Sequence, residues 1–291
     1  VLLAATMLLT SGVTVFAYRV DAVIDKPYLA LGADLSPQEQ MTVLSLLGLS
    51  DINVDDYDII SITNADEHEY LDKYLDASII GTRALSSVLV VGKEAGNGIH
   101  VTTKNISYCT EGMYRNALLT AGIEDADITV AGPFSISGTA ALVGAIKAYE
   151  TMTGEEIDDE NLDAANDELV LTGKLVEDIG DSEKAEDLMA LVKQEVAENK
   201  LTSAEDIQNV VDQACNQLDI QLSEENQKQI AELMKKIEGL DLDVDKLKDQ
   251  AKDLYQKLED LDFHVDKESV GNFFTRIIDA IVKFFQGLFG K

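Results

Sequence analysis

The sequence predicts an α+β protein: an N-terminal sheet with packed helices, followed by an all-helical region and a C-terminal amphipathic helix. In the first half of the chain, apolar residues repeat with a period of two in some segments and with a helical period in others. From residue 150 onward the period is helical throughout. Hydrophobic residues make up 46% of the 291 residues, which is enough for a packed core. We therefore expect one sheet covered by helices, next to a helical region.

The first half alternates predicted helices and strands in the order αβαββαβα. A helix is predicted over 37–47, because Ser36 suits the N-cap, Pro37 the first helical position and Glu39 a capping box. The Gly and Asn residues between 94 and 98 favour a hairpin turn that joins two strands. The predicted strands span 58–63, 85–91, 99–107 and 126–131, and the other predicted helices span 66–75, 110–121 and 137–149.

The second half predicts helices and no strands. In each predicted helix the apolar residues form one stripe, as Ile230, Leu233, Met234 and Ile237 do, and the acidic residues mostly fall on the opposite face. That arrangement is typical of helices that pack together and expose a charged side to water. The predicted helices span 162–179, 182–199, 203–218, 224–240 and 244–261.

Composition excludes several classes of protein. Asp and Glu number 54 against 23 Lys and Arg, and the resulting net charge of −31 disfavours a nucleic-acid partner, since a phosphate backbone needs a cationic face. Two cysteines are too few for a disulfide scaffold or a Cys-rich metal site, and we predict no metal and no cofactor. Cys109 and Cys215 could pair in an oxidising compartment or remain separate buried thiols, and their spacing does not decide between the two.

The first 17 residues resemble the apolar core of a signal peptide. The apolar run ends in small residues at Ala17 and is shorter than the ~20 residues that a membrane-spanning helix needs. We therefore expect a secreted, extracytoplasmic protein. The chain divides into a signal-peptide remnant over 1–17, an α/β domain over 18–149, an acidic helical region over 150–268 and an amphipathic helix over 269–291.

The segment 269–291 carries a broad apolar face with basic residues Arg276 and Lys283 opposite. A basic amphipathic end on a very acidic chain favours contact with an anionic membrane surface or an envelope component. The alternative is that this face packs on the protein's own helical region or on a second copy, which would give self-association. The predicted contact residues are Phe273, Phe274, Ile277, Ile281, Phe284, Phe285 and Leu288.

Candidate ligand-binding residues lie where predicted strands end and helices begin. Loops at strand ends are common ligand sites, a helix N-terminus attracts anions, and a guanidinium group binds phosphate or carboxylate. An anion or a glycan is therefore a possible ligand, while the alternative is that these side chains cap helices and line turns. The candidates are Asn64, Asp66, His68, Arg83, Ser137 and Thr139.

A hydrolase is the alternative function. Ser86, Ser87, Ser135 and Ser137 could supply a nucleophile, yet none lies in a Gly-x-Ser-x-Gly elbow. His100 lies in a predicted strand without an acidic neighbour in sequence to orient it. We therefore expect a protein that is not an enzyme, and keep an extracytoplasmic hydrolase acting on an envelope component as the second reading.

Four segments carry a resemblance to a known family: ITNADEHEYL at 62–71, IGTRALSS at 80–87, MYRNAL at 113–118 and PFSISGTAAL at 133–142. They resemble the domain-of-unknown-function 1002 family, which comprises exported proteins of Gram-positive, Firmicutes-type bacteria. The likeness continues into the helical half. It implies export and an envelope setting, and it implies no activity that could be assigned to particular residues.

The amphipathic C-terminal segment leads to a test with vesicles. The full chain is expected to float with anionic phosphatidylglycerol liposomes, and a chain stopped at Lys267 is expected to stay in the soluble fraction, because the apolar and basic face has been removed. Flotation with neutral phosphatidylcholine vesicles is the control for the charge contribution. Equal flotation of the two chains would contradict membrane contact by this segment.

Overall fold

The computed structural model describes residues 26–50, 53–154, 156–240 and 242–250. The predicted signal segment over 1–17 and the predicted amphipathic helix over 269–291 lie outside these residues. The end of the helix predicted over 244–261 also lies outside them, while residues 244–250 are helical.

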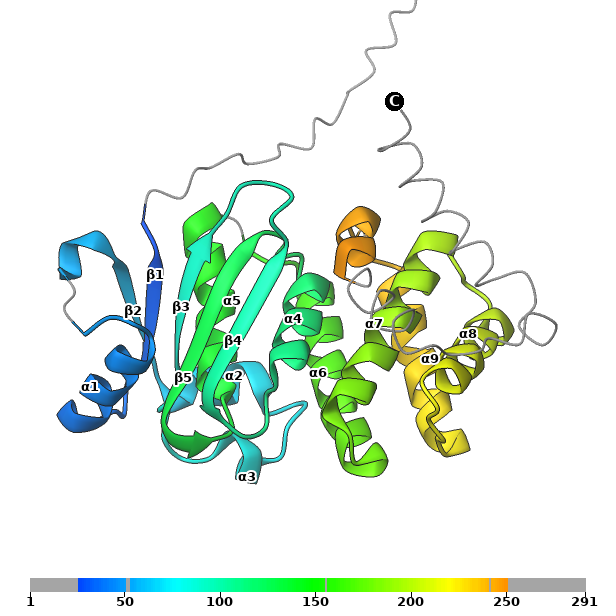
Figure 1. Cartoon of the computed structure of the whole chain (residues 1–291), viewed down its shortest axis with the longest axis horizontal. Coiled ribbons are helices and arrows are strands. Elements are labelled where there is room, and N and C mark those ends of the chain that lie inside the picture. Colours follow the sequence, from blue (N-terminus) through cyan, green and yellow to red (C-terminus); the bar gives the residue numbers. More distant parts are fainter. Residues whose placement is uncertain (1–25, 51–52, 155, 241, 251–291) are drawn as a thin grey trace, which may run out of the picture.

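A five-stranded mixed sheet forms the N-terminal part, with strand order β2-β1-β3-β5-β4 (Figure 1). The outer pairs, β1 with β2 and β4 with β5, are parallel, whereas β3 runs antiparallel to both of its neighbours. The strands are β1 (Tyr28–Gly32), β2 (Asp58–Ile62), β3 (Ser87–Gly92), β4 (Ile99–Ile106) and β5 (Ala126–Ile136).

The predicted order of elements lacked β1, and the predicted hairpin is wrong. The residues YLALG of β1 form a short apolar run without clear alternation, because the strand is buried on both faces between β2 and β3. The turn over 94–98 does exist, but β5 lies between the two strands that it joins. Its Gly96 and Gly98 N–H groups donate to the Asp125 carboxylate at 3.0 and 2.7 Å, which ties the turn to the start of β5.

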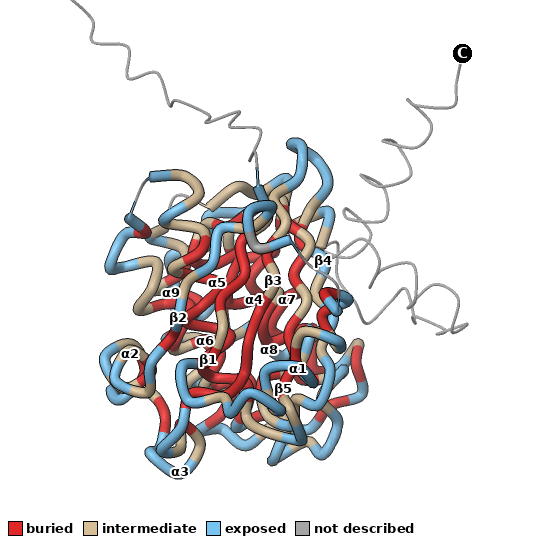
Figure 2. Tube along the Cα trace, turned by 90° about the vertical axis from the view of Figure 1, so that its left-hand side faces the viewer, coloured by how far each residue is buried: buried red, intermediate tan, exposed pale blue. Residues whose placement is uncertain are grey.

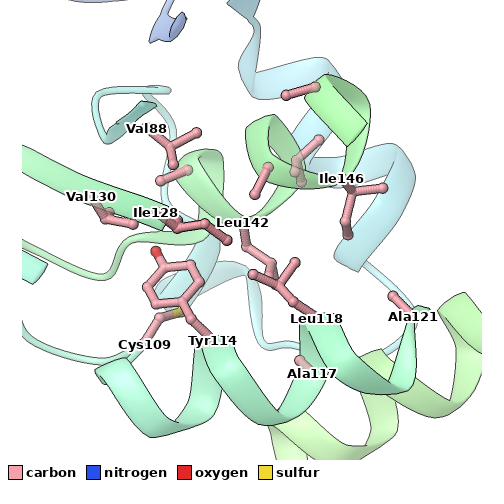
Figure 3. Close-up of a cluster of buried hydrophobic side chains, with 14 of the residues drawn as sticks. Val88, Cys109, Tyr114, Ala117, Leu118, Ala121, Ile128, Val130, Leu142 and Ile146 are labelled. Atoms are coloured by element: carbon pink, nitrogen blue, oxygen red, sulfur yellow. The ribbon is translucent and has the colours of Figure 1, made fainter. Parts of the chain in front are cut away.

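Helices cover the two faces of the sheet unequally. Helix α5 (Thr139–Thr153) packs on β1 and β3, α2 (Asn64–Leu71) packs on α5, and α4 (Glu111–Thr120) packs on β4. Helix α1 (Pro37–Leu46) covers part of the opposite face (Figure 1). Close packing of α5 requires Gly144, because a Cβ there would lie 2.8 Å from the Ala30 Cβ. Figure 3 shows Leu118 of α4 beside Leu142 and Ile146 of α5 in this core.

The helical region consists of α6 (Asp159–Ile179), α7 (Ser182–Asn199), α8 (Ala204–Gln217) and α9 (Glu224–Glu238), with a buried apolar core of its own. Helix α7 has the bounds that the sequence predicts. The α+β class, with a sheet region followed by helices, is confirmed. Helix α6 joins the two parts, since its Ala165 and Leu169 belong to the buried core of the sheet. Figure 2 shows buried segments of both the sheet and the helices at the centre of the molecule.

The two cysteines lie in different cores and are both free and buried. Cys109 lies among the sheet-side apolar residues and Cys215 among those of the helical region. Burial raises the pKa of the Cys109 thiol to about 12 and that of Cys215 to about 11. Both side chains therefore act as small apolar groups rather than nucleophiles.

A fully buried ion pair joins the helical region to the sheet layer. Lys193 of α7 donates to both carboxylate oxygens of Glu168 on α6, at 3.0 and 3.1 Å, and to the Asn116 carbonyl of α4 at 2.9 Å. Its ammonium group also lies 3.1 Å from the Thr120 hydroxyl. Three helices thus share one charged centre from which water is excluded.

Removing one member of this pair should be costly. Lys193→Met leaves the Glu168 carboxylate buried without its cation, and urea unfolding should show a loss of about 3–5 kcal/mol. The double substitution Lys193→Met with Glu168→Leu should recover a large part of that loss, because neither charge then remains buried.

Lys228→Met is the matched control, since Lys228 forms an exposed ion pair with Glu232 on α9. Its stability should equal that of the unmodified protein. Equal stability of Lys193→Met and Lys228→Met would show that the buried pair does not hold the two parts together.

Candidate functional site

A pocket of about 470 Å³ lies at one end of the sheet, beside the start of α5. Its walls come from separate segments: the stretch from α3 (Ala77–Ile80) into β3, the connection between β4 and α4, the end of β5 and the first turn of α5. The lining combines hydroxyl groups with apolar and aromatic side chains. It comprises Glu67, Ser78, Ile79, Ile80, Gly81, Thr82, Arg83, Leu85, Ser86, Ser107, Tyr108, Phe134, Ile136, Ser137 and Thr139.

Glu67 of α2 is the buried acid of this pocket, with 1% of its surface exposed. One carboxylate oxygen accepts from the Thr139 hydroxyl at 2.7 Å, and the other accepts from the Asn64 amide at 3.1 Å. Burial raises the pKa of Glu67, and these two hydrogen bonds oppose that rise. The carboxyl therefore forms the back wall of the pocket rather than a freely exposed charge.

Arg83 lines the pocket but already has an anionic partner. Its guanidinium group donates to the Asp34 carbonyl at 2.8 Å and to the Glu39 carboxylate at 3.1 Å. Its side chain is 48% exposed. The positive charge of Arg83 is thus balanced by Glu39 before any ligand arrives.

A β-bulge shapes the aromatic wall. The register between β4 and β5 shifts between Lys104 and Ile106, and Asn105 takes a left-handed conformation with φ 60°. The Asn105 amide donates to the Gly132 carbonyl at 3.1 Å, just before the chain reaches Phe134. Phe134 is 49% exposed, an unusual exposure for a phenylalanine in a pocket wall.

The structure brings together four of the six predicted binding residues. Arg83, Ser137 and Thr139 line the pocket, and Asn64 reaches it through its bond to Glu67. Asp66 and His68 do not line it. Asp66 accepts from the Thr63 backbone N–H in a capping box and forms an ion pair with Lys147, while His68 lies 2.5 Å from Asp72.

Sequence reasoning missed Glu67, Tyr108 and Phe134. Glu67 belongs to the acidic run DEHE, which predicts a solvated helix face, and no local signal marks it as the buried member. Phe134 precedes the predicted helix in the segment PFSISG, whose composition resembles a loop, and an aromatic residue in such a segment was the available clue.

Two of the four serines considered for a hydrolase, Ser86 and Ser87, are engaged in structural hydrogen bonds. The Ser86 hydroxyl accepts from the Ala141 N–H at 2.9 Å, and the Ser87 hydroxyl accepts from the Gly32 N–H at 3.1 Å. Both residues are buried. Among the described residues no histidine lines the pocket, and His100 lies exposed on β4.

In ranges 26–50, 53–154, 156–240 and 242–250, no group of three or more His, Cys, Asp or Glu side chains is placed to hold a metal ion. Within the same part of the chain, none of the helices has the length and apolar character needed to cross a bilayer.

The fold and the pocket define an α+β protein with a small polar and aromatic cavity at one end of its sheet. The chain belongs to the DUF1002 family, described as "protein of unknown function (DUF1002)", whose model matches residues 31–254. It is similar to the uncharacterized protein YpuA of Bacillus subtilis (strain 168), with 39% identity over 271 residues that cover 91% of this chain and 92% of YpuA. No solved structure matches the chain.

The contacts of Asp66 give a pH-dependent stability. Burial alone would raise the pKa of this carboxyl, but hydrogen bonds from Lys147 and Thr63 outweigh burial and lower the pKa to about 2. Because the pKa is lower in the folded state, the ionised carboxyl stabilises the fold at pH values above about 4, the ordinary pKa of an aspartate. This stabilisation is lost as the pH falls toward 2. Asp66→Asn should therefore cost about 1 kcal/mol at neutral pH, allowing for solvent screening of this partly exposed pair.

Urea unfolding at neutral pH and at about pH 2 measures the two limits. The difference between Asp66→Asn and the unmodified chain should shrink to nearly zero in acid. A difference that is the same at both pH values would mean that charge plays no part in the role of Asp66.

Proposed function

We propose that this protein is a non-enzymatic, extracytoplasmic protein of the cell envelope that binds a neutral sugar in the pocket beside α5. The observation that carries the proposal is the balance of charge in the lining. Arg83 is paired with Glu39, and Glu67 lies buried behind Thr139, so the groups that face a ligand are hydroxyls and aromatic or apolar surfaces.

Such a lining fits a sugar better than an anion. A sugar ring presents C–H groups on one face, which pack on an aromatic side chain, and hydroxyl groups at its edge, which pair with serine and threonine. Phe134 and Tyr108 supply the first kind of contact, and Ser78, Ser107 and Ser137 the second. An anion would find no unpaired cation in this lining and would meet a chain of net charge −31.

The envelope location rests on the apolar segment 1–17 and on the family resemblance. Attachment to a membrane or partner rests on the segment 269–291, whose residues lie outside those that the structure describes. The pocket would then serve recognition of an envelope glycan, while the C-terminal segment keeps the protein at the surface where that glycan occurs.

A hydrolase acting on an envelope component is the second candidate, and Glu67 is the observation that favours it. A buried carboxyl with a raised pKa beside a pocket is the pattern of a general acid. Incubation with muropeptides and analysis of the products tests this reading. Cleavage by the unmodified chain that Glu67→Gln abolishes would establish it in place of the binding function.

The sugar-binding function predicts a response at Phe134. Titration calorimetry with an N-acetylglucosamine tetramer and with muropeptides should give binding that Phe134→Ala weakens about tenfold or more, because the aromatic contact is removed. Met41→Ala is the control, since Met41 is another exposed large apolar side chain and lies on α1, outside the lining.

Binding of an anion instead of a sugar is tested separately, with inorganic phosphate and Arg83→Ala. Inorganic phosphate should not bind measurably, and Arg83→Ala should leave sugar affinity within about threefold of the original. Phosphate binding that depends on Arg83 would favour an anion site. Sugar binding that Phe134→Ala and Met41→Ala reduce equally would place the sugar elsewhere.

A further inference from the structure

Glu67 connects the two opposite walls of the pocket through single hydrogen bonds. On one side, Asn64 donates to Glu67 at 3.1 Å and reaches the Gly81 carbonyl at 3.4 Å, in the wall that precedes β3. On the other side, Thr139 donates to Glu67 at 2.7 Å, and its hydroxyl lies 3.2 Å from the Ser137 hydroxyl. Ser137 lines the pocket and is partly exposed.

Glu67, Thr139 and Ser137 therefore form a chain of three hydrogen-bonding groups that runs from a buried carboxyl to the pocket. The direction of such a chain is set by the carboxyl, because an ionised carboxylate can accept but cannot donate. With Glu67 ionised, Thr139 donates to it and accepts from Ser137. The Ser137 proton then points away from the pocket, and Ser137 offers a ligand its lone pairs.

Protonation of Glu67 reverses the chain. The Asn64 amide is always a donor, so it keeps one carboxyl oxygen as an acceptor, and the proton occupies the oxygen that faces Thr139. Thr139 then accepts from Glu67 and donates to Ser137. Ser137 in turn has its own proton free to donate to a ligand.

We propose that Glu67 is a positioning residue of the pocket, which sets through Thr139 whether Ser137 presents a hydrogen-bond acceptor or a donor to the ligand. The inference rests on the proposed function in one respect, that the ligand is a sugar bound in this pocket. The chain of hydrogen bonds from Glu67 through Thr139 to Ser137, here called the relay, is present in the ligand-free protein. Specificity between a sugar hydroxyl and a carbonyl group would then follow the protonation of a side chain that is almost fully buried.

The surroundings of Glu67 act on its pKa in opposite directions, and the net effect is a raised pKa. Burial raises the pKa of Glu67, the hydrogen bonds from Thr139 and Asn64 and the neighbouring His68 lower it, and the charge of Asp34 raises it. Cys109 and Tyr114 also face the carboxyl, and burial raises the pKa of both, so they stay neutral over the range in which a carboxyl titrates. No other acid among the described residues accepts from the Thr139 hydroxyl.

The first test needs no ligand. In the full chain, the backbone amide signals of Ser137 and Thr139 should shift with pH and share one midpoint with the ¹³C signal of the Glu67 carboxyl, above the usual ~4.3 of glutamate. In Glu67→Gln the two amides should not titrate, because an amide side chain keeps the arrangement of the protonated acid. Glu69→Gln is the matched control, since Glu69 is an exposed acid on the same helix.

If Glu67→Gln does not fold, the pH titration of the unmodified chain is by itself a sufficient test. Amides of Ser137 and Thr139 that do not follow the Glu67 carboxyl would overturn the relay. A purely structural role for Glu67 would lower stability on substitution without linking these three signals.

The second test uses the N-acetylglucosamine tetramer. Its dissociation constant for the unmodified chain should change about fivefold or more across the titration of Glu67, since a mismatched hydrogen bond replaces a good one. Glu67→Gln should give one constant at every pH, equal to the acid limit of the unmodified chain. Binding that is the same at all pH values in both proteins would overturn the inference and leave sugar binding intact, while titrating amides without any sugar binding would overturn the proposed function and leave the relay intact.

Discussion

Helix α4 is enclosed on nearly every side, and this burial is the constraint on which the rest of the structure depends. One face packs on the sheet, and the other contacts α6 and α7. A helix in that position must satisfy its polar groups internally, because a buried group without a partner costs as much as a lost hydrogen bond. The Asn116 backbone carbonyl and the Thr120 hydroxyl accept from Lys193, and Thr120 donates to Glu168, so the helical region completes the core of the sheet region.

The same helix sets the geometry of the pocket. The Tyr114 hydroxyl donates to the Gly138 carbonyl at 2.5 Å, directly before α5 begins. Gly138 has φ 98°, and a Cβ there would lie 2.7 Å from that hydroxyl, so the approach requires glycine. Tyr108, at the other side of the pocket, extends its hydroxyl end against Gly173 of α6. The pocket is therefore built on rigid contacts that begin in the core, which is what a site of fixed shape requires.

Local patterns in the sequence predicted those features that depend on neighbouring residues alone, such as helix caps and helix bounds. The capping box of Ser36 and Glu39 and the whole of α7 follow from the rules of helix ends and helical period. The position of strand β1 and the insertion of β5 between β3 and β4 depend on pairing between distant segments. A local turn motif carries no information about such pairing. The site divides in the same way: Arg83 and Ser137 stand out at strand ends, whereas Glu67 becomes distinctive only through burial by α5.

The strongly negative charge of the chain is consistent with a pocket for an uncharged ligand. A net charge of −31 keeps the protein soluble and repels anionic polymers, whatever their shape. A pocket that depended on capturing an anion would work against this field, and Arg83 is already neutralised by Glu39. An uncharged ligand experiences little of the field, so its recognition depends on shape, on aromatic contact and on the direction of a few hydrogen bonds. A buried carboxyl that fixes one of those directions is then an effective place to encode specificity, because it acts through the hydroxyl groups of Thr139 and Ser137.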